Sequence, residues 1–92
     1  VDPASGELVG GSLGDQTSQC LTNLDAICQA AGTTLRQALR LTIYTTQLDR
    51  FAEINEAYAA FFDEEPPARV TVGVAALPLG APIEIDAIVA LD

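Results

Sequence analysis

The stretch that decides the fold is Pro67-Ala68-Arg69-Val70-Thr71-Val72-Gly73-Val74-Ala75-Ala76-Leu77-Pro78. Apolar residues alternate with others along it, which predicts a β-strand over residues 69–76. One side of this strand carries Val70, Val72, Val74 and Ala76, and the other carries Arg69, Thr71, Gly73 and Ala75. Arg69 is one of only four basic residues in the chain. An arginine at the start of a hydrophobic strand needs an anionic partner, which is either a carboxylate of the protein or a ligand.

A further strand is predicted over residues 83–91, and it carries Glu84, the candidate partner of Arg69. Two interpretations of this pair stay open. In the first, Arg69 and Glu84 form a salt bridge that joins the two strands. In the second, Arg69 binds a small carboxylate through two parallel hydrogen bonds, while Glu84 orients or deprotonates a water molecule. Spacing alone favours the salt bridge.

The first helix is predicted over residues 13–31, after a turn-rich segment with a short extended piece at residues 7–9. Ser12 and Asp15 have the spacing of a capping box, and Gly32 is a natural C-terminal stop. One buried stripe repeats at helical spacing and consists of Leu21, Leu24, Cys28 and Ala31.

A strand is predicted over residues 39–46, where Leu39, Leu41 and Ile43 alternate with polar residues. Asp49 is expected to cap a second helix over residues 50–62. The apolar face of that helix consists of Phe51, Ile54, Tyr58, Phe61 and Phe62. Asn55 lies at the edge of this face, and the interpretation from the residues alone is a half-buried amide satisfied by the backbone.

The order of elements is helix, strand, helix, strand, strand. It predicts a single α+β domain over residues 1–92, with two helices packed on one face of a small, mixed and mostly antiparallel sheet. The other face of the sheet is expected to carry all or part of a mainly polar set, namely Arg69, Thr71, Gly73, Glu84 and Asp86. Such a face suits a subunit interface that contains a site.

Composition excludes several kinds of site. The net charge is −9, from 13 acidic and 4 basic residues, whereas nucleic acids and anionic membranes bind basic surfaces. The chain has no histidine, which removes histidine-based triads and histidine metal ligands. Cys20 and Cys28, if they share a helix, lie about 12 Å apart, too far for a disulfide. Unpaired thiols favour a cytoplasmic location, and neither a membrane-spanning run nor a signal peptide is recognisable.

The stretch quoted above, together with Gly80 and Ile83-Glu84-Ile85-Asp86-Ala87-Ile88-Val89, resembles the signature of the Rid/YjgF family of enamine and imine deaminases, which includes RidA. Upstream, residues 1–8, 16–32, 44–46 and 51–62 resemble the same family. The resemblance therefore extends over essentially the whole chain.

The resemblance implies a homotrimer of chorismate-mutase-like α+β subunits, with ligand clefts between the subunits. It implies hydrolysis of 2-imino or enamine acids to 2-keto acids and ammonia (2-iminobutanoate/2-iminopropanoate deaminase activity), without a metal or organic cofactor. Arg69 matches the family arginine that binds the substrate carboxylate, and Glu84 matches the glutamate that positions the attacking water. Thr71 matches a position that lines the site, and Asn55 matches a structural or near-site amide.

The sequence departs from the family pattern at three places. Val70 stands where serine is common, and Thr71 stands where cysteine is frequent. Residue 1 aligns past the first hairpin of the family, whose Tyr and Ser contribute to the cleft. Without that hairpin, a sheet edge is expected to be exposed.

Two other functional classes are weighed against the deaminase. A non-catalytic module of the same fold would use Arg69 and Glu84 to hold a metabolite or each other. Ribonuclease activity, also attached to this family, is disfavoured by the charge of −9 and the absence of histidine.

Overall fold

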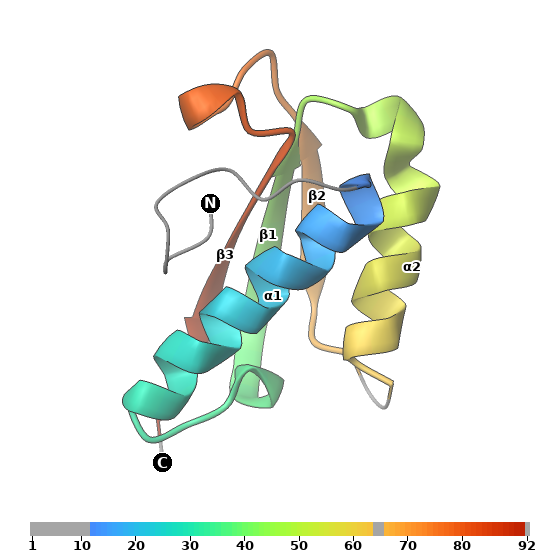
Figure 1. The fold of residues 1–92 in the computed structure, drawn as a ribbon. Helices are drawn as coiled ribbons and strands as arrows, with labels where there is room; N and C mark the ends of the chain where they lie inside the picture. Colours follow the sequence, from blue (N-terminus) through green and yellow to red (C-terminus); the bar gives the residue numbers. More distant parts are fainter. Residues whose placement is uncertain (1–11, 64–65, 92) are drawn as a thin grey trace.

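The computed structural model describes residues 12–63 and 66–91, and within them the predicted order of elements is confirmed (Figure 1). These elements are α1 (Leu13–Ala30), β1 (Ala38–Thr45), α2 (Phe51–Phe61), β2 (Arg69–Gly73) and β3 (Ile83–Val89). Short 3-10 turns precede β1, α2 and β3, at Leu35–Gln37, Leu48–Arg50 and Pro78–Gly80. The extended piece predicted at residues 7–9 lies outside the described residues.

The described strands form one mixed sheet in the order β2-β1-β3, and both helices cover the same face of it (Figure 1). β1 runs parallel to β2 and antiparallel to β3. The α+β prediction is therefore confirmed. Among the described residues, β2 and β3 are the two edge strands of the sheet.

The core lies between the helices and the sheet. Leu41 and Ile43 of β1, Leu21 of α1 and Ile54 of α2 are completely buried there. Each such side chain contributes about 1.5–3 kcal/mol by leaving water. The predicted apolar face of α2 is confirmed, with Tyr58 and Phe62 also buried.

Two predicted faces are wrong at their ends. Leu39 is 66% exposed because a register irregularity between Ala38 and Arg40 interrupts the alternation of β1. Thr45, which was not assigned to this side, continues it after Leu41 and Ile43 and is completely buried. Ala31 is exposed because α1 ends at Ala30, one residue before it.

The lengths of β2 and β3 follow from their common partner. β1 extends only from Ala38, opposite Val89, to Thr45, opposite Gly73 and Ile83. The strands predicted to reach residues 76 and 91 end at Gly73 and Val89, which pair with the last residues of β1 at its two ends. One further ladder bond follows β2, from the Val74 amide to the Thr45 carbonyl at 2.9 Å.

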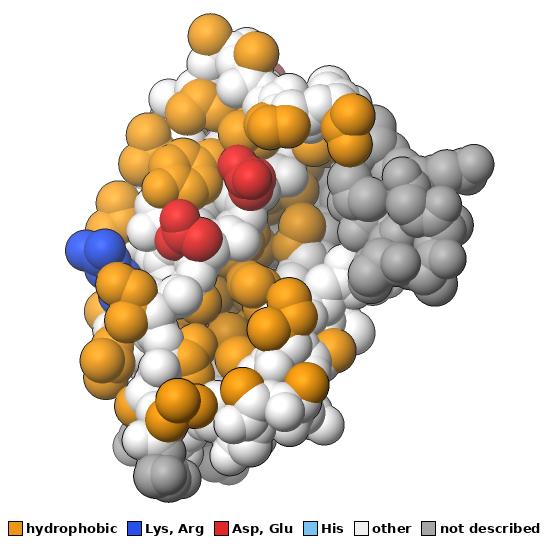
Figure 2. All heavy atoms as spheres, turned by 90° about the vertical axis from the view of Figure 1, so that its left-hand side faces the viewer, with side chains coloured by type: hydrophobic (Ala, Val, Ile, Leu, Met, Phe, Trp, Pro, Cys, Tyr) orange, Lys and Arg blue, Asp and Glu red, His pale blue; other side chains and the backbone are white. Residues whose placement is uncertain are grey.

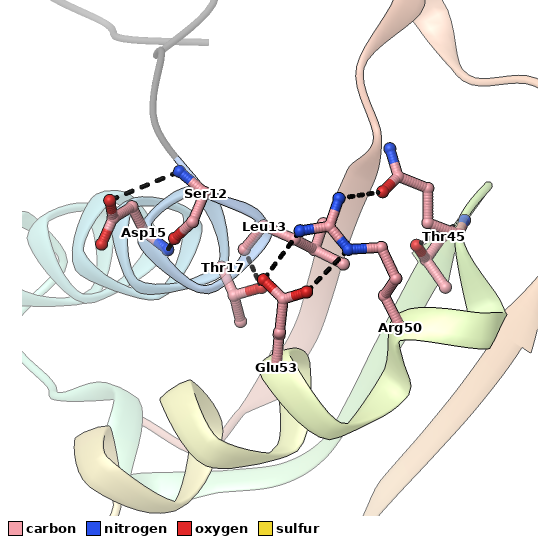
Figure 3. A network of polar contacts seen from close by, with 8 residues as sticks. Ser12, Leu13, Asp15, Thr17, Thr45, Arg50 and Glu53 are labelled. Carbon is pink, nitrogen blue, oxygen red and sulfur yellow. Dashed lines mark hydrogen bonds and ion pairs between the residues drawn. The ribbon is translucent and has the colours of Figure 1, made fainter.

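The two helices begin differently. The capping box of α1 is confirmed, because the Asp15 amide donates to Ser12 Oγ at 3.1 Å and the Ser12 amide to Asp15 Oδ2 at 3.4 Å (Figure 3). The predicted cap of α2 is wrong, since Asp49 lies inside the preceding 3-10 turn and no side chain caps the helix. Arg50 precedes α2 and donates instead to both carboxylate oxygens of Glu53, at 2.6 and 2.9 Å (Figure 3).

Both cysteines lie on α1 as free thiols, which confirms that they do not pair. None of the helices within residues 12–63 and 66–91 is long and apolar enough to cross a membrane.

Candidate functional site

The side chain of Arg69 lies on the helix-covered side of the sheet, at the start of β2. Arg69 pairs in register with Leu41, which is completely buried beneath the helices. Paired residues of neighbouring strands share a face, so Arg69 points toward α2. Its Nη1 donates to Asn55 Oδ1 at 2.9 Å. The prediction that the backbone satisfies Asn55 is therefore wrong, and the amide is exposed rather than half-buried.

Two aromatic rings of α2 complete the surroundings of Arg69. Its guanidinium carbon lies 4.7 Å from the centre of the Tyr58 ring and 5.3 Å from that of Phe51. Both distances are within the range of cation–π attraction. Phe51, Asn55 and Tyr58 recur at helical spacing, so one face of α2 presents all three.

Tyr58 also ties the residues before β2 to α2. Its hydroxyl donates to the backbone carbonyl of Pro67 at 2.9 Å. Burial raises the pKa of Tyr58, and the positive charge of Arg69 acts in the opposite direction. The hydroxyl is therefore protonated near neutral pH and available as a donor.

Arg69 has no carboxylate partner among the described residues. Arg50 pairs with Glu53, and Arg36 pairs with Asp63 at 3.5 Å. The charge of Arg69 is instead surrounded by an amide and two aromatic rings, which leave its positive charge unneutralised. A cavity of about 320 Å³ opens beside it. The cavity is lined by Asn55, Tyr58, Ala59, Pro66, Pro67 and Arg69.

Glu84 lies on the opposite face of the sheet from Arg69. It pairs in register with Tyr44, whose neighbours along β1, Ile43 and Thr45, are the buried residues. Tyr44 and Glu84 therefore point to the face that the helices leave uncovered. The salt bridge between Arg69 and Glu84 favoured by spacing is absent, because the two residues lie on different faces of the two outer strands.

The uncovered face carries acidic and apolar residues together. Exposed apolar residues on it include Val70, Val72 and Ile88, which are 47%, 38% and 54% exposed. The Tyr44 hydroxyl donates to Asp86 Oδ2 at 3.3 Å, and the negative charge of Asp86 is the main cause that raises the pKa of Tyr44. Figure 2 shows acidic side chains among hydrophobic ones on the side of the molecule where β3 lies.

Of the mainly polar set predicted for the uncovered face, Glu84 and Asp86 are there, whereas Arg69, Thr71 and Gly73 are on the helix-covered side. Thr71 is half-buried and pairs with the buried Ile43, on the same face as Arg69. A carbon placed on Gly73 as Cβ would lie 3.1 Å from Cδ2 of Leu48, so the chain packs closely there. Arg69 and Thr71 therefore share the helix-covered face of β2, and Asn55 of α2 contacts Arg69 there.

A second cavity, of about 260 Å³, lies between α1, β3 and the turn at Pro78–Gly80. Glu84 and Cys20 both line it. Burial raises the pKa of Cys20, and the charge of Glu84 adds to that effect. Within residues 12–63 and 66–91, no three His, Cys, Asp or Glu side chains lie close enough together to hold a metal ion.

Sequence reasoning assigned Phe51 and Tyr58 to the core alone and missed their contact with Arg69. The signal was present in their spacing around Asn55, which places the three side chains on one face of the helix. What the sequence lacked was the pairing of β2 with β1, which turns Arg69 toward that face.

Comparison with known proteins supplies the family. The family model described as Endoribonuclease L-PSP matches residues 1–91. The chain belongs to this family. It is 47% identical over 88 residues to a RutC family protein of Pyrococcus horikoshii, covering 96% of this chain and 70% of that protein. It is 39% identical over 88 residues to the 2-iminobutanoate/2-iminopropanoate deaminase of Bos taurus, covering 96% of this chain and 64% of the relative.

Solved structures of the same family share the fold. RidA from an Antarctic Psychrobacter species superimposes with a TM-score of 0.91 at 40% identity, over 98% of this chain and 72% of that one. E. coli TdcF, solved with bound serine, superimposes with a TM-score of 0.90 at 38% identity, over 98% and 72% of the two chains. The Rid/YjgF resemblance inferred from sequence motifs is confirmed.

Proposed function

We propose that this Rid family member hydrolyses 2-imino and enamine acids to 2-keto acids and ammonia. The observation that carries the proposal is that Arg69 has no carboxylate partner among the described residues. In a chain with 13 acidic residues, its guanidinium is held by neutral partners beside a cavity. Such a cation suits a small carboxylate ligand. Serine bound to TdcF and the deaminase name of the bovine relative support a carboxylate-bearing substrate.

In the proposed reaction, Arg69 binds the substrate carboxylate and so fixes the imine carbon. Glu84 accepts a proton from a water molecule, whose oxygen adds to that carbon as the C=N π electrons move to nitrogen. Glu84 passes that proton to the nitrogen, which gives a carbinolamine. Glu84 then takes the proton of the new hydroxyl group and delivers it to the nitrogen, so that C=O forms as the C–N electron pair leaves with ammonia and the keto acid is released. Imines already hydrolyse in water without a catalyst, so the required rate acceleration is small. Positioning of the substrate and one general base, which accelerates a reaction by about 10²–10⁴-fold, are sufficient for it. The chain's own residues supply every step, without a metal or organic cofactor.

Asn55 and Thr71 take supporting roles in this site. Asn55 holds Arg69 through its carbonyl oxygen, so its NH₂ group remains able to donate to a ligand. Thr71 follows Arg69 by two residues on the same face of β2. We propose both as substrate-binding residues.

A complete site requires more than one copy of the chain. Arg69 and Glu84 belong to opposite faces of one sheet, so a molecule as small as an imino acid contacts both only if a second copy supplies one of them. The uncovered face, with Val70, Val72 and Ile88 exposed, offers the apolar surface for such an association. We propose a homotrimer with the site between subunits, in the cytoplasm.

The separation of Arg69 from Glu84 also favours a second candidate, a non-catalytic module that binds keto acids through Arg69 alone. Ribonuclease activity is less well supported, because the chain has neither histidine nor lysine and a net charge of −9.

A coupled assay separates the two candidates. A threonine dehydratase generates 2-iminobutanoate in the presence of semicarbazide, which traps the imine before it hydrolyses. A deaminase shifts the product from semicarbazone to 2-oxobutanoate, and Glu84→Gln reduces this effect by about 10²-fold or more. Asp86→Asn is the matched control, since Asp86 lies two residues further on the same face of β3. If wild-type protein binds 2-oxobutanoate but does not divert the imine, the binding module is correct.

A further inference from the structure

Three side chains of α2 surround the guanidinium of Arg69, one through a hydrogen bond and two through aromatic rings. Phe51, Asn55 and Tyr58 lie at helical spacing and contact the same group from one face of the helix. Tyr58 is also fastened at its far end by the bond from its hydroxyl to the Pro67 carbonyl. The Tyr58 ring beside Arg69 is therefore fixed to the backbone just before β2, the strand that begins with Arg69.

The three nitrogens of the Arg69 guanidinium differ in their hydrogen bonds. Nη1 donates to Asn55, and among the described residues Nε and Nη2 have no hydrogen-bond partner. Aromatic rings attract the face of a guanidinium and leave its edges open. An arginine carboxylate pair with two parallel hydrogen bonds uses one edge of the guanidinium. The edge formed by Nε and Nη2 is thus free of hydrogen bonds to the described residues and open to a ligand.

We propose that Phe51 and Tyr58 are positioning residues, whose rings fix the plane of the Arg69 guanidinium so that its Nε–Nη2 edge is oriented in advance toward the ligand's carboxylate. This inference rests on the proposed function in one respect, that the ligand is a carboxylate. A free arginine side chain samples many rotamers, and a ligand that had to order it would bind more weakly. The two rings supply that order before the ligand arrives.

A matched pair of variants separates positioning from stability. Phe51 and Phe61 are both half-buried phenylalanines at opposite ends of α2. Phe51 contacts Arg69, whereas Phe61 contacts the ring of Phe62. Phe51→Leu and Phe61→Leu each remove one ring from this helix, and only the first removes a ring from beside the guanidinium.

The first measurement is the ¹⁵N–¹H spectrum of the arginine side chains in the intact protein. The four basic residues of the sequence are all arginines, and Arg69→Ala assigns the Nε–Hε signal of Arg69. We expect ring currents to displace this signal from that of the exposed Arg40, and the displacement to decrease in Phe51→Leu but not in Phe61→Leu. A signal that is the same in wild type and Phe51→Leu would overturn the inference without reference to any activity.

The second measurement is the dissociation constant of 2-oxobutanoate, followed through the same signal. Loss of a cation–π contact of ordinary strength weakens binding by about 5- to 30-fold in Phe51→Leu, with Phe61→Leu close to wild type. Tyr58→Leu has a similar effect, and Tyr58→Phe, which restores the ring, recovers most of the affinity. Equal weakening in Phe51→Leu and Phe61→Leu would overturn positioning while the proposed function stands. Failure of wild type to bind any keto or imino acid would overturn the proposed function, and this inference with it.

Discussion

Arg69 and Glu84 lie on opposite faces of the sheet, and we therefore predict that two inactive variants regain activity when their chains assemble together. Arg69→Ala retains Glu84, and Glu84→Gln retains Arg69. If each site takes Arg69 from one subunit and Glu84 from the next, an assembly of both variants contains a site in which both residues are intact. If both residues came from the same chain, every site in the mixed assembly would lack one of them.

The expected gain follows from the symmetry of a trimer. In a ring of two chains of one variant and one of the other, a single interface joins an intact Arg69 to an intact Glu84. Activity of mixed trimers is therefore about one third of wild type. Each parent variant should be about 10²-fold or more below wild type.

The assay needs mixed assemblies free of the parent trimers. The two variants are produced in the same cells with different affinity tags, and material that carries both tags is purified and tested in the coupled dehydratase assay. Arg69→Ala mixed with the Arg69→Ala, Glu84→Gln double variant is the control, since no interface in that mixture holds both residues. Activity no higher than that of the parents in both mixtures would refute the two-copy site.

Three further predictions concern charge and stability. Leu21→Ala, at a completely buried position of α1, should lower the free energy of unfolding by about 2–5 kcal/mol, whereas Ile27→Ala, at a position 67% exposed on the same helix, should change it little in urea titrations. The hydrogen bond from Arg50 lowers the pKa of Glu53 below its usual 4.5, so this pair stabilises the fold above pH 4.5, and its contribution is lost as the pH falls through the lowered pKa. Glu53→Gln should therefore make the melting temperature less dependent on pH in that acid range. A plot of melting temperature against pH that runs parallel to that of wild type would contradict this. RNA should show no salt-sensitive binding in filter assays, because the net charge is −9.

The fold was predictable because its signals are local. Alternation at Arg69–Gly73, the capping box at Ser12 and Asp15, and the apolar spacing of α2 each act over a few residues. The exact ends of the strands were not predictable, since Gly73 and Val89 are the residues that pair with the two ends of β1. Where β2 and β3 end thus depends on the length of β1, and the residues after Gly73 and Val89 do not reveal it.

The residues of the candidate site were selected from the sequence, but how they are arranged was not predictable. Arg69 and Glu84 were selected by motif, and spacing suggested that they meet. Whether they do depends on the insertion of β1 between β2 and β3 and on the register, which sends Arg69 to one face and Glu84 to the other. Register is set by pairing across long sequence separation, and a shift of one residue would have reversed either side chain.

The claim that Arg69 is the carboxylate clamp is tested most directly by comparing Arg69→Ala with Arg40→Ala in the coupled 2-iminobutanoate assay. Both substitutions remove one arginine from the sheet, and neither arginine has an ion pair among the described residues. Two charge-assisted hydrogen bonds are worth about 3–6 kcal/mol together, so Arg69→Ala should lower kcat/KM by roughly 10²-fold or more, with Arg40→Ala near wild type. Unchanged activity in Arg69→Ala, or an equal loss in both variants, would contradict the carboxylate clamp.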